Sequence, residues 1–267
     1  MAITTFDGVI AGCKPPQFLY KAPAGINAAG KTYSAFYAAG VPGAAAAPTP
    51  GLSGVALTSY PGQIPFTNPT AGQLSYLARF VCSLSASSGQ VMLLDRLWHN
   101  SGISSFSNSV QTINSVAFPA RDQNGTSDGV GVLLALEVTN TPGTGNPTIT
   151  VTYTNSDGVG SRTGQNIIGT GSVSVQTEFH QIRLEAGDKG VRSVQSIQFT
   201  GSWGGGTMNL VAYRILSVNQ VGNGGIATAN DVTTNGMVQL FDNTVPFITF
   251  AVAGTTTIQG VMTVTQG

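Results

Sequence analysis

The sequence predicts an all-β fold, in which a β-sandwich or jelly-roll domain follows an extended, proline-rich N-terminal arm. Alternating or β-branched segments recur after residue 70, and no stretch of ten or more residues combines helical apolar spacing with helix caps. Nine of the thirteen prolines lie in the first 70 residues. Many short strands separated by turn signals are typical of sandwiches and jelly rolls. We therefore expect the arm at residues 1–70 and the domain at residues 71–267.

The expected arm contains apolar clusters that would be poor choices for a free linker. Proline fixes φ and biases the preceding residue toward extended conformations, and the four alanines at 44–47 are too few for a stable helix. An extended segment of this length is able to cross a neighbouring subunit. The residues expected to bind a partner are Phe18, Leu19, Tyr20, Tyr33, Phe36, Tyr37, Ile64 and Phe66. The alternative is that the arm packs back on its own domain.

Twelve segments after residue 70 are expected to form strands. They are Leu74–Leu84, Gln90–Leu97, Val110–Ala117, Val130–Val138, Thr148–Thr154, Val173–Thr177, Gln181–Leu184, Val194–Thr200, Met208–Val218, Met237–Phe241, Pro246–Val252 and Thr256–Val264. Two turns, at 127–131 and 156–160, both have the sequence Ser-Asp-Gly-Val-Gly, in which Asp-Gly supplies the positive φ of a tight turn.

The strand-rich C-terminal region from about residue 220 is almost uncharged. Asp231 and Asp242 are its only charged residues. Free strand edges of such low charge would favour aggregation. We expect this region to be buried in the domain or in an oligomer interface.

Charged residues make up only 8% of the chain, whereas ordinary soluble domains have about 25%. Catalysis, metal binding and nucleic-acid binding all depend on ionisable groups, so this composition argues against an enzyme and against a cofactor. The formal net charge is zero, which leaves no basic field for nucleic acid. No run approaches the ~18 consecutive apolar residues of a membrane span, so no membrane partner is expected. Cys13 and Cys82 are expected to be two unpaired thiols.

A polar loop at residues 121–128 holds weak candidates for a metal site. Asp122, Asn124 and Asp128 offer hard oxygen ligands at a spacing that could hold calcium. The bidentate Glu that closes a calcium loop is missing. A hydrogen-bonded turn is the favoured interpretation.

Three further segments contain polar or aromatic groups that could belong to a site. Glu178 and His180 share one face of an expected strand, but no nucleophile-elbow context accompanies them, so a solvated strand edge is favoured over acid–base chemistry. Trp203 lies among glycines and could contact a sugar or a partner, or pack in the core. In the cluster Asp95–Asn100, structural pairing with charges on a neighbouring strand is favoured over a functional pocket.

Four segments between about residues 75 and 220 resemble virion structural proteins of tailed bacteriophages. They are residues 97–102 (Leu-Trp-His-Asn-Ser-Gly), 117–122 (Ala-Phe-Pro-Ala-Arg-Asp), 148–158 and 184–194 (Leu-Glu-Ala-Gly-Asp-Lys-Gly-Val-Arg-Ser-Val). Within that class the chain looks most like head cement or decoration proteins. The resemblance carries no catalytic motif.

The resemblance implies a β-sandwich or jelly-roll subunit on the outside of the capsid, made in the host cytoplasm, often as a trimer. Its partner would be the major capsid protein, and its role would be to stabilise the head. The alternative is a tail, fibre or baseplate module with an adhesion or carbohydrate-binding role, using Trp203. A polysaccharide hydrolase would need a pair of carboxylates at a cleft, which the scattered acids do not suggest.

Overall fold

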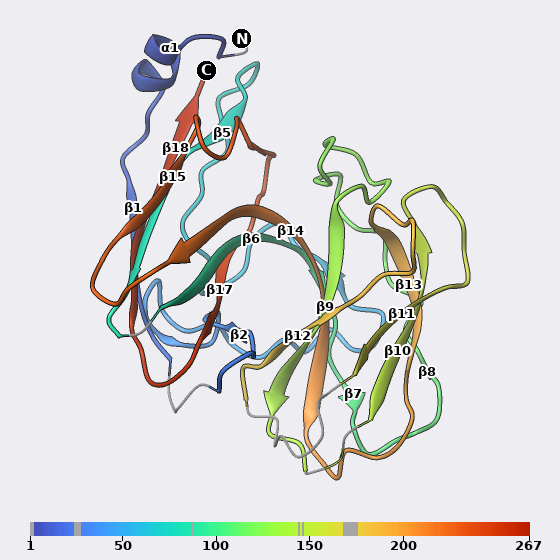
Figure 1. The fold of residues 1–267 in the computed structure, drawn as a ribbon. Coiled ribbons are helices and arrows are strands. Elements are labelled where there is room, and N and C mark those ends of the chain that lie inside the picture. Colours follow the sequence, from blue (N-terminus) through green and yellow to red (C-terminus); the bar gives the residue numbers. More distant parts are fainter. Residues whose placement is uncertain (1–2, 24–27, 87, 144, 146, 168–175) are drawn as a thin grey trace. The chain divides into compact units, whose positions relative to one another are not determined.

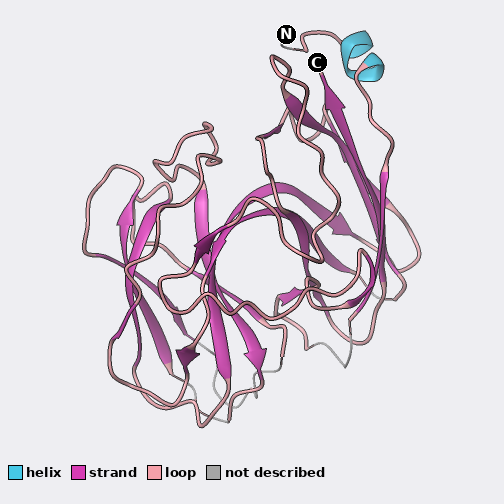
Figure 2. Ribbon diagram, turned by 180° about the vertical axis from the view of Figure 1, so that it is seen from behind, coloured by secondary structure: helices cyan, strands magenta, loops and turns pink. Residues whose placement is uncertain are grey.

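The computed structural model describes residues 3–23, 28–86, 88–143, 145, 147–167 and 176–267. These residues form antiparallel strands, together with the six-residue helix α1 (Phe6–Ala11) (Figure 2). The all-β class expected from the sequence is confirmed.

The chain divides into two compact units instead of an arm and one domain. Unit 1 comprises residues 1–46, 58–95 and 215–267, and unit 2 comprises residues 47–57 and 96–214. The strands β6 (Gly89–His99) and β14 (Thr207–Val221) contribute residues to both units (Figure 1). Residue 70, the expected boundary, lies inside unit 1.

Unit 1 is a β-sandwich. Its first sheet has the order β15 (Thr228–Asp231), β5 (Ser75–Leu84), β18 (Ile258–Gln266), β1 (Gln17–Ala22) and β3 (Ala39–Val41), with β16 (Gln239–Leu240) also paired to β5. The second layer comprises the first part of β6, β17 (Pro246–Val252) and β2 (Tyr33–Ser34), which belong to an eight-stranded sheet. Phe80 and Met262 of the first sheet share one buried apolar cluster with Leu93 and Phe250 of the second. This cluster is the core between the two layers.

Unit 2 is a second sandwich with its own core. One sheet has the order β11 (Arg162–Ile167), β10 (Thr148–Asn155), β13 (Val191–Phe199) and β8 (Gln111–Thr112). The other contains β12 (Phe179–Ile182), β9 (Val132–Asn140) and the first part of β14, with β7 (Ile103–Ser104) on β14 and β4 (Val55–Ala56) on the end of β6. Val151 and Ile197 of the first sheet pack in one cluster with Leu134 and Leu210 of the second.

The first 70 residues do not form a separate extended arm. They contribute β1, β2, β3 and β4, which pair with β18, β17, β1 and β6 respectively. Lys21 is buried, and its Nζ donates to the carbonyl oxygens of Ala38, Pro42 and Gly43 at 2.8–3.2 Å. The prolines therefore lie in the loops before and between short strands, and the alternative that this segment packs on its own fold is confirmed.

Most of the strands expected after residue 70 are present, with small differences at their ends. Neither β11 nor β15 was among the expected strands, because both are short and largely polar and so lack apolar alternation. The expected strand Val173–Thr177 lies mostly outside the described residues, and residues 176 and 177 form a turn. Strong alternation therefore predicted the buried strands better than the polar ones at sheet edges.

Candidate functional site

The first sheet of unit 1 buries one face and leaves the other open to solvent. Along β18 the residues alternate, with Ile258, Gly260 and Met262 buried and Gln259 and Val261 at least partly exposed. Because antiparallel partners point to the same side, this alternation defines an outward face that extends across the neighbouring strands.

An apolar row crosses this outward face in register. Phe18 of β1 lies opposite Val261 of β18, Val261 lies opposite Val81 of β5, and Val81 lies opposite Ala229 of β15. Phe18 is 55% exposed. Tyr20, two residues along β1, lies opposite Val41 of β3, which is 52% exposed. We call these six residues the outward apolar row.

Two charged residues, Arg79 and Asp231, border the outward apolar row. They lie opposite each other on β5 and β15, and Thr263 of β18 lies on the other side of Arg79. The side-chain and backbone hydrogen bonds that Thr233 donates to Asp231 lower the pKa of that carboxyl. The border is therefore electrically neutral at pH 7.

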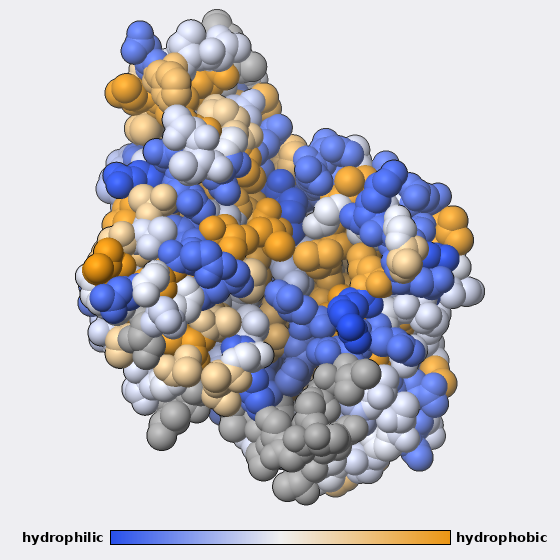
Figure 3. All heavy atoms as spheres, in the orientation of Figure 1, coloured by the Kyte–Doolittle hydropathy of each residue, from blue (hydrophilic) through white to orange (hydrophobic). Residues whose placement is uncertain are grey.

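The helix α1 adds further exposed apolar side chains to unit 1. The side chain of Thr5 caps the helix by accepting from the backbone N–H of Gly8 at 3.1 Å. None of the helical residues is buried, and Phe6 and Ile10, one turn apart, are 63% and 70% exposed. Apolar residues lie among polar ones at the surface of the end of unit 1 that carries α1 (Figure 3).

Backbone contacts fix α1 at the end of β18. Gln266 donates to the carbonyl oxygen of Gly12 at 2.9 Å, and Lys14 donates to that of Val264 at 2.8 Å. A Cβ on Gly12 would come within 2.5 Å of the carbonyl oxygen of Gln266. Glycine at this position therefore allows the chain to leave the helix directly against the strand.

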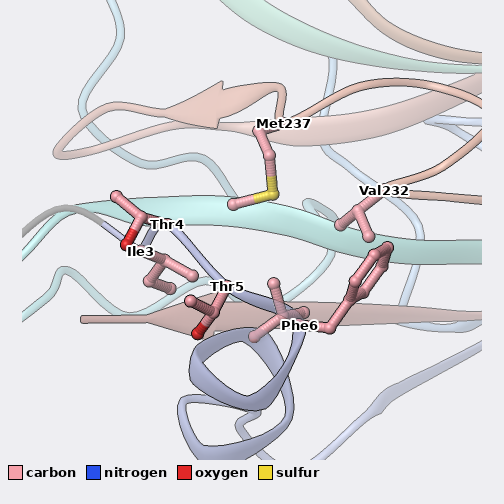
Figure 4. A pocket seen from close by; sticks show the side chains of 7 residues that line it. Ile3, Thr4, Thr5, Phe6, Val232 and Met237 are labelled. Atoms are coloured by element: carbon pink, nitrogen blue, oxygen red, sulfur yellow. The ribbon is translucent and has the colours of Figure 1, made fainter.

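A pocket of about 240 Å³ lies beside α1. In Figure 4, Met237 points toward the helix, while Phe6 and Val232 lie together at one end. The remaining lining residues are Ile3, Thr4, Thr5 and Val9. No charged side chain lines it, so it suits an apolar group.

The structure divides the residues expected to bind a partner into two groups. Leu19, Tyr33, Phe36 and Ile64 are at most 2% exposed and pack inside unit 1, which corrects their assignment as partner contacts. Tyr33 stacks on Phe250, and Phe36 packs edge to face on Phe247. The apolar clusters at these positions are core residues of short strands and turns. Phe18 is exposed, and Tyr20, Tyr37 and Phe66 are partly buried.

Trp203 is not an exposed aromatic. Its side chain is fully buried, with ring centroids 5.7 Å from His180 and 6.4 Å from Phe199. Gly143 and Gly145 lie against its backbone, where a Cβ on Gly143 would be 2.6 Å from the Trp203 carbonyl oxygen. The glycines around this tryptophan allow close backbone packing over it, and core packing, the other alternative, is confirmed.

The Asp122 loop is a hydrogen-bonded turn. The Asp122 carboxylate accepts from the backbone N–H groups of Asn124, Thr126, Gly129 and Val130 and from the Thr126 hydroxyl, all at 2.8–3.0 Å. Burial raises the pKa of this carboxyl, but the hydrogen bonds from Thr126, Asn124 and Val130 outweigh burial and lower it overall. Within the described ranges no group of three His, Cys, Asp or Glu side chains is placed to hold a metal ion.

The cluster Asp95–Asn100 forms structural pairs, as favoured from the sequence. Arg96 makes a two-pronged pair with Glu137, at 2.7 and 3.2 Å, and both side chains are fully buried. Arg96 also donates to His99 Nδ1 at 3.1 Å. Burial, and then the charge of Arg96, lower the pKa of His99 to about 2, so this imidazole is neutral at physiological pH.

Glu178 and His180 form a pair that is more buried than the expected solvated edge. Glu178 Oε2 lies 3.1 Å from His180 Nε2, and their side chains are 1% and 12% exposed. The backbone on either side of Glu178 pairs with Val138 of β9. Sequence alternation placed both side chains on one face but did not indicate the depth of the pair.

The residues that sequence reasoning missed are Val81, Ala229 and Val261 of the row, and Phe6, Ile10 and Met237 around α1. Alternation alone indicates that Val81 and Val261 point away from the core. The pairing of β1, β18, β5 and β15 depends on contacts between segments as far apart as residues 18 and 261. That pairing has no local signal in the sequence.

No protein-family model matches the chain, and no curated protein matches it. Among solved structures it has weak similarity to that of the infectious bursal disease virus Gt strain, at 10% identity over 95% of this chain and 82% of that one, with a TM-score of 0.19. To the structure of the Gx strain it has 11% identity over 95% of this chain and 80% of that one, with a TM-score of 0.21. To the VP2 subviral particle of the same virus it has 10% identity over 98% of this chain and 83% of that one, with a TM-score of 0.19. TM-scores this low support no argument about fold or function.

None of the helices in the described part of the chain has the length and apolar character to cross a membrane.

Proposed function

We propose that this protein is a non-enzymatic structural subunit of a virus particle and that it binds a neighbouring protein through the outward face of its first sheet. The observation that supports this most strongly is the outward apolar row, which crosses four strands in register on a solvent-exposed face. Large apolar side chains on an exposed, continuous surface are typical of protein interaction sites.

The composition of this face fits a protein interface. Its centre is apolar, and its border holds Thr263, Gln259 and the oppositely charged Arg79 and Asp231. Interfaces commonly combine an apolar, aromatic-containing centre that is poor in charge with a polar rim. Stable interfaces bury about 800 Å² on each partner, and repetition over a closed shell strengthens weaker contacts through avidity.

At a finer level, we propose a cement or decoration role on the outer surface of the major capsid protein of a tailed bacteriophage. Support comes from the sequence resemblance in unit 2 and from the low charge, which suits a protein that lies against other protein. Jelly-roll topology, trimeric assembly and location in the virion stay predictions. Phe18 and Tyr20 are the expected partner residues that belong to the outward apolar row.

A tail, fibre or baseplate module with carbohydrate-binding activity is the second candidate. Its only named contact, Trp203, is buried and so cannot stack on a sugar. A different pocket in unit 2, described in the next subsection, gives this candidate its remaining support.

The test is decoration of emptied capsids by purified protein with a charge introduced into the outward apolar row. We expect Phe18→Asp and Val261→Asp each to weaken capsid binding at least tenfold, because each places a carboxylate where apolar surface would be buried. Val159→Asp is the matched control, since Val159 is 52% exposed in a turn of unit 2. Circular dichroism verifies that each variant is folded. Full occupancy by both folded variants of the row would refute the proposed surface.

A further inference from the structure

A second pocket, of about 500 Å³, lies within unit 2 and joins features that the proposed function does not use. Both Ser-Asp-Gly-Val-Gly turns contribute to it, the first through Ser127 and the second through Gly158. Its volume lies within the range of about 300–1,000 Å³ typical of small-molecule sites. The two repeated turns therefore meet around one cavity.

Three hydroxyl groups on the wall of this pocket accept hydrogen bonds from neighbouring protein groups. Ser115 Oγ accepts from the backbone N–H of Val194 at 2.9 Å, and the Gln195 side-chain amide donates to Thr154 Oγ1 and Ser193 Oγ at 3.1 and 3.0 Å. A hydroxyl has one hydrogen to donate and two lone pairs. Each of these three hydroxyls accepts from the protein and also has one hydrogen that it can donate.

The charges at the pocket are balanced. Arg192 lines it, and a guanidinium nitrogen of Arg192 lies 3.6 Å from Asp128 Oδ1. Their side chains are 48% and 52% exposed, so both remain accessible to a ligand. The carboxylate of Asp128 offsets the positive charge of Arg192 at the edge of the pocket. A neutral ligand that both donates and accepts hydrogen bonds is therefore favoured.

An aromatic ring gives the pocket a firm apolar part. Phe118 lines it and is 5% exposed, and its ring centroid lies 5.5 Å from that of the fully buried Trp98. Packing against Trp98 fixes the position of the Phe118 ring. The apolar C–H groups of a ligand could contact the small part of Phe118 that lines the pocket.

We propose that this pocket binds a neutral saccharide. A sugar ring presents adjacent hydroxyls, each both donor and acceptor, together with apolar C–H groups. The hydroxyls of Ser115, Thr154 and Ser193 would donate to it or accept from it, and the Arg192 guanidinium would donate to it. This inference does not depend on the capsid-binding proposal, because the pocket lies in unit 2 and the outward apolar row in unit 1.

The test is binding of the purified full chain to an array of neutral and acidic oligosaccharides, followed by titration calorimetry with the best-bound sugar. We expect binding to at least one neutral sugar. Arg192→Ala and Thr154→Val should each weaken that binding at least tenfold. The controls are Arg183→Ala, at an exposed arginine, and Thr150→Val, on the same strand as Thr154. Neither control position lines the pocket, so both should bind as the wild type does.

Three outcomes would overturn the inference. They are binding to no sugar on the array, binding to acidic sugars only, and binding that folded Arg192→Ala and Thr154→Val variants both retain. Capsid decoration by the same two variants, measured in parallel, separates the proposals. We expect it to be unchanged, so loss of sugar binding would leave the capsid proposal standing.

Discussion

At the scale of single residues, the Asp122 carboxylate organises the loop that the sequence offered as a calcium candidate. Five donors from residues 124–130 converge on its two oxygens. Asn124 and Asp128 lie in the same loop, but Asn124 contributes its backbone N–H, not a ligand oxygen. Composition indicated oxygen-rich side chains, whereas the direction in which each group points depends on the loop backbone.

We expect Asp122→Ala to lower the free energy of unfolding by about 2 kcal/mol or more, because it leaves several loop N–H groups without their charged acceptor. Urea denaturation at pH 7 provides the measurement. Asp157→Ala is the control, since Asp157 is an exposed aspartate in the second Ser-Asp-Gly-Val-Gly turn. Equal effects of the two substitutions would contradict the central role of Asp122.

The lowered pKa of Asp122 also predicts a pH dependence. The hydrogen bonds of the folded state stabilise the ionised form of the Asp122 carboxyl. Its contribution to the free energy of unfolding is therefore fully present above the pKa of the unfolded state, about 3.9, and is lost as pH falls through the lower pKa of the folded state. The stability difference between wild type and Asp122→Ala should therefore shrink between pH 6 and pH 2.5. Denaturation midpoints across this range test it, and a difference that grows toward low pH would have the wrong sign.

At the scale of elements, neighbouring residues on β5 have opposite environments. Val81 belongs to the outward apolar row, while Cys82 is buried in the core, where burial raises the pKa of its thiol to about 12. Cys13, at the end of α1, is exposed, and the two cysteines are not bridged, as the sequence predicted.

The native protein should therefore react rapidly with one equivalent of a thiol reagent, at Cys13, while Cys82 reacts only on unfolding. The Cys13→Ser variant should be unreactive when folded, and Val81→Cys in that background should restore rapid labelling. Mass spectrometry of the labelled peptides identifies each site. Rapid labelling of Cys82 in folded Cys13→Ser protein would show that the register of β5 is wrong.

Sequence patterning predicted the elements whose residues alternate strongly, such as β5, β10, β13 and β18. It failed for β1 and β2, because prolines and glycines close to short apolar runs suggested an extended arm. It also failed for Trp203, whose glycine neighbours suggested exposure although its side chain is fully buried. Which strands pair, and so where the outward apolar row lies, follows from long-range contacts that no local pattern encodes.

At the scale of the whole molecule, the low content of charged residues is reduced further at the surface, because several charged side chains are buried inside the two sandwiches. Charged groups such as Arg96, Glu137 and Lys21 are buried in pairs or hydrogen bonds, so they contribute little to the surface. The almost uncharged C-terminal region supplies β17 to one layer of unit 1, and β15 and β18 to the other. Burial in the fold thus explains part of the low charge of that region, and the outward faces of β15 and β18 remain accessible to a partner.

Copy number in purified virions tests the central claim most directly. Quantitative mass spectrometry, with the major capsid protein as internal standard, gives the number of copies per particle. A structural subunit repeated over the capsid lattice should be present in a fixed, high ratio to the major capsid protein. Its copy number should be comparable to the number of local three-fold positions on the capsid. Only a few copies per particle, or none, would contradict a capsid role.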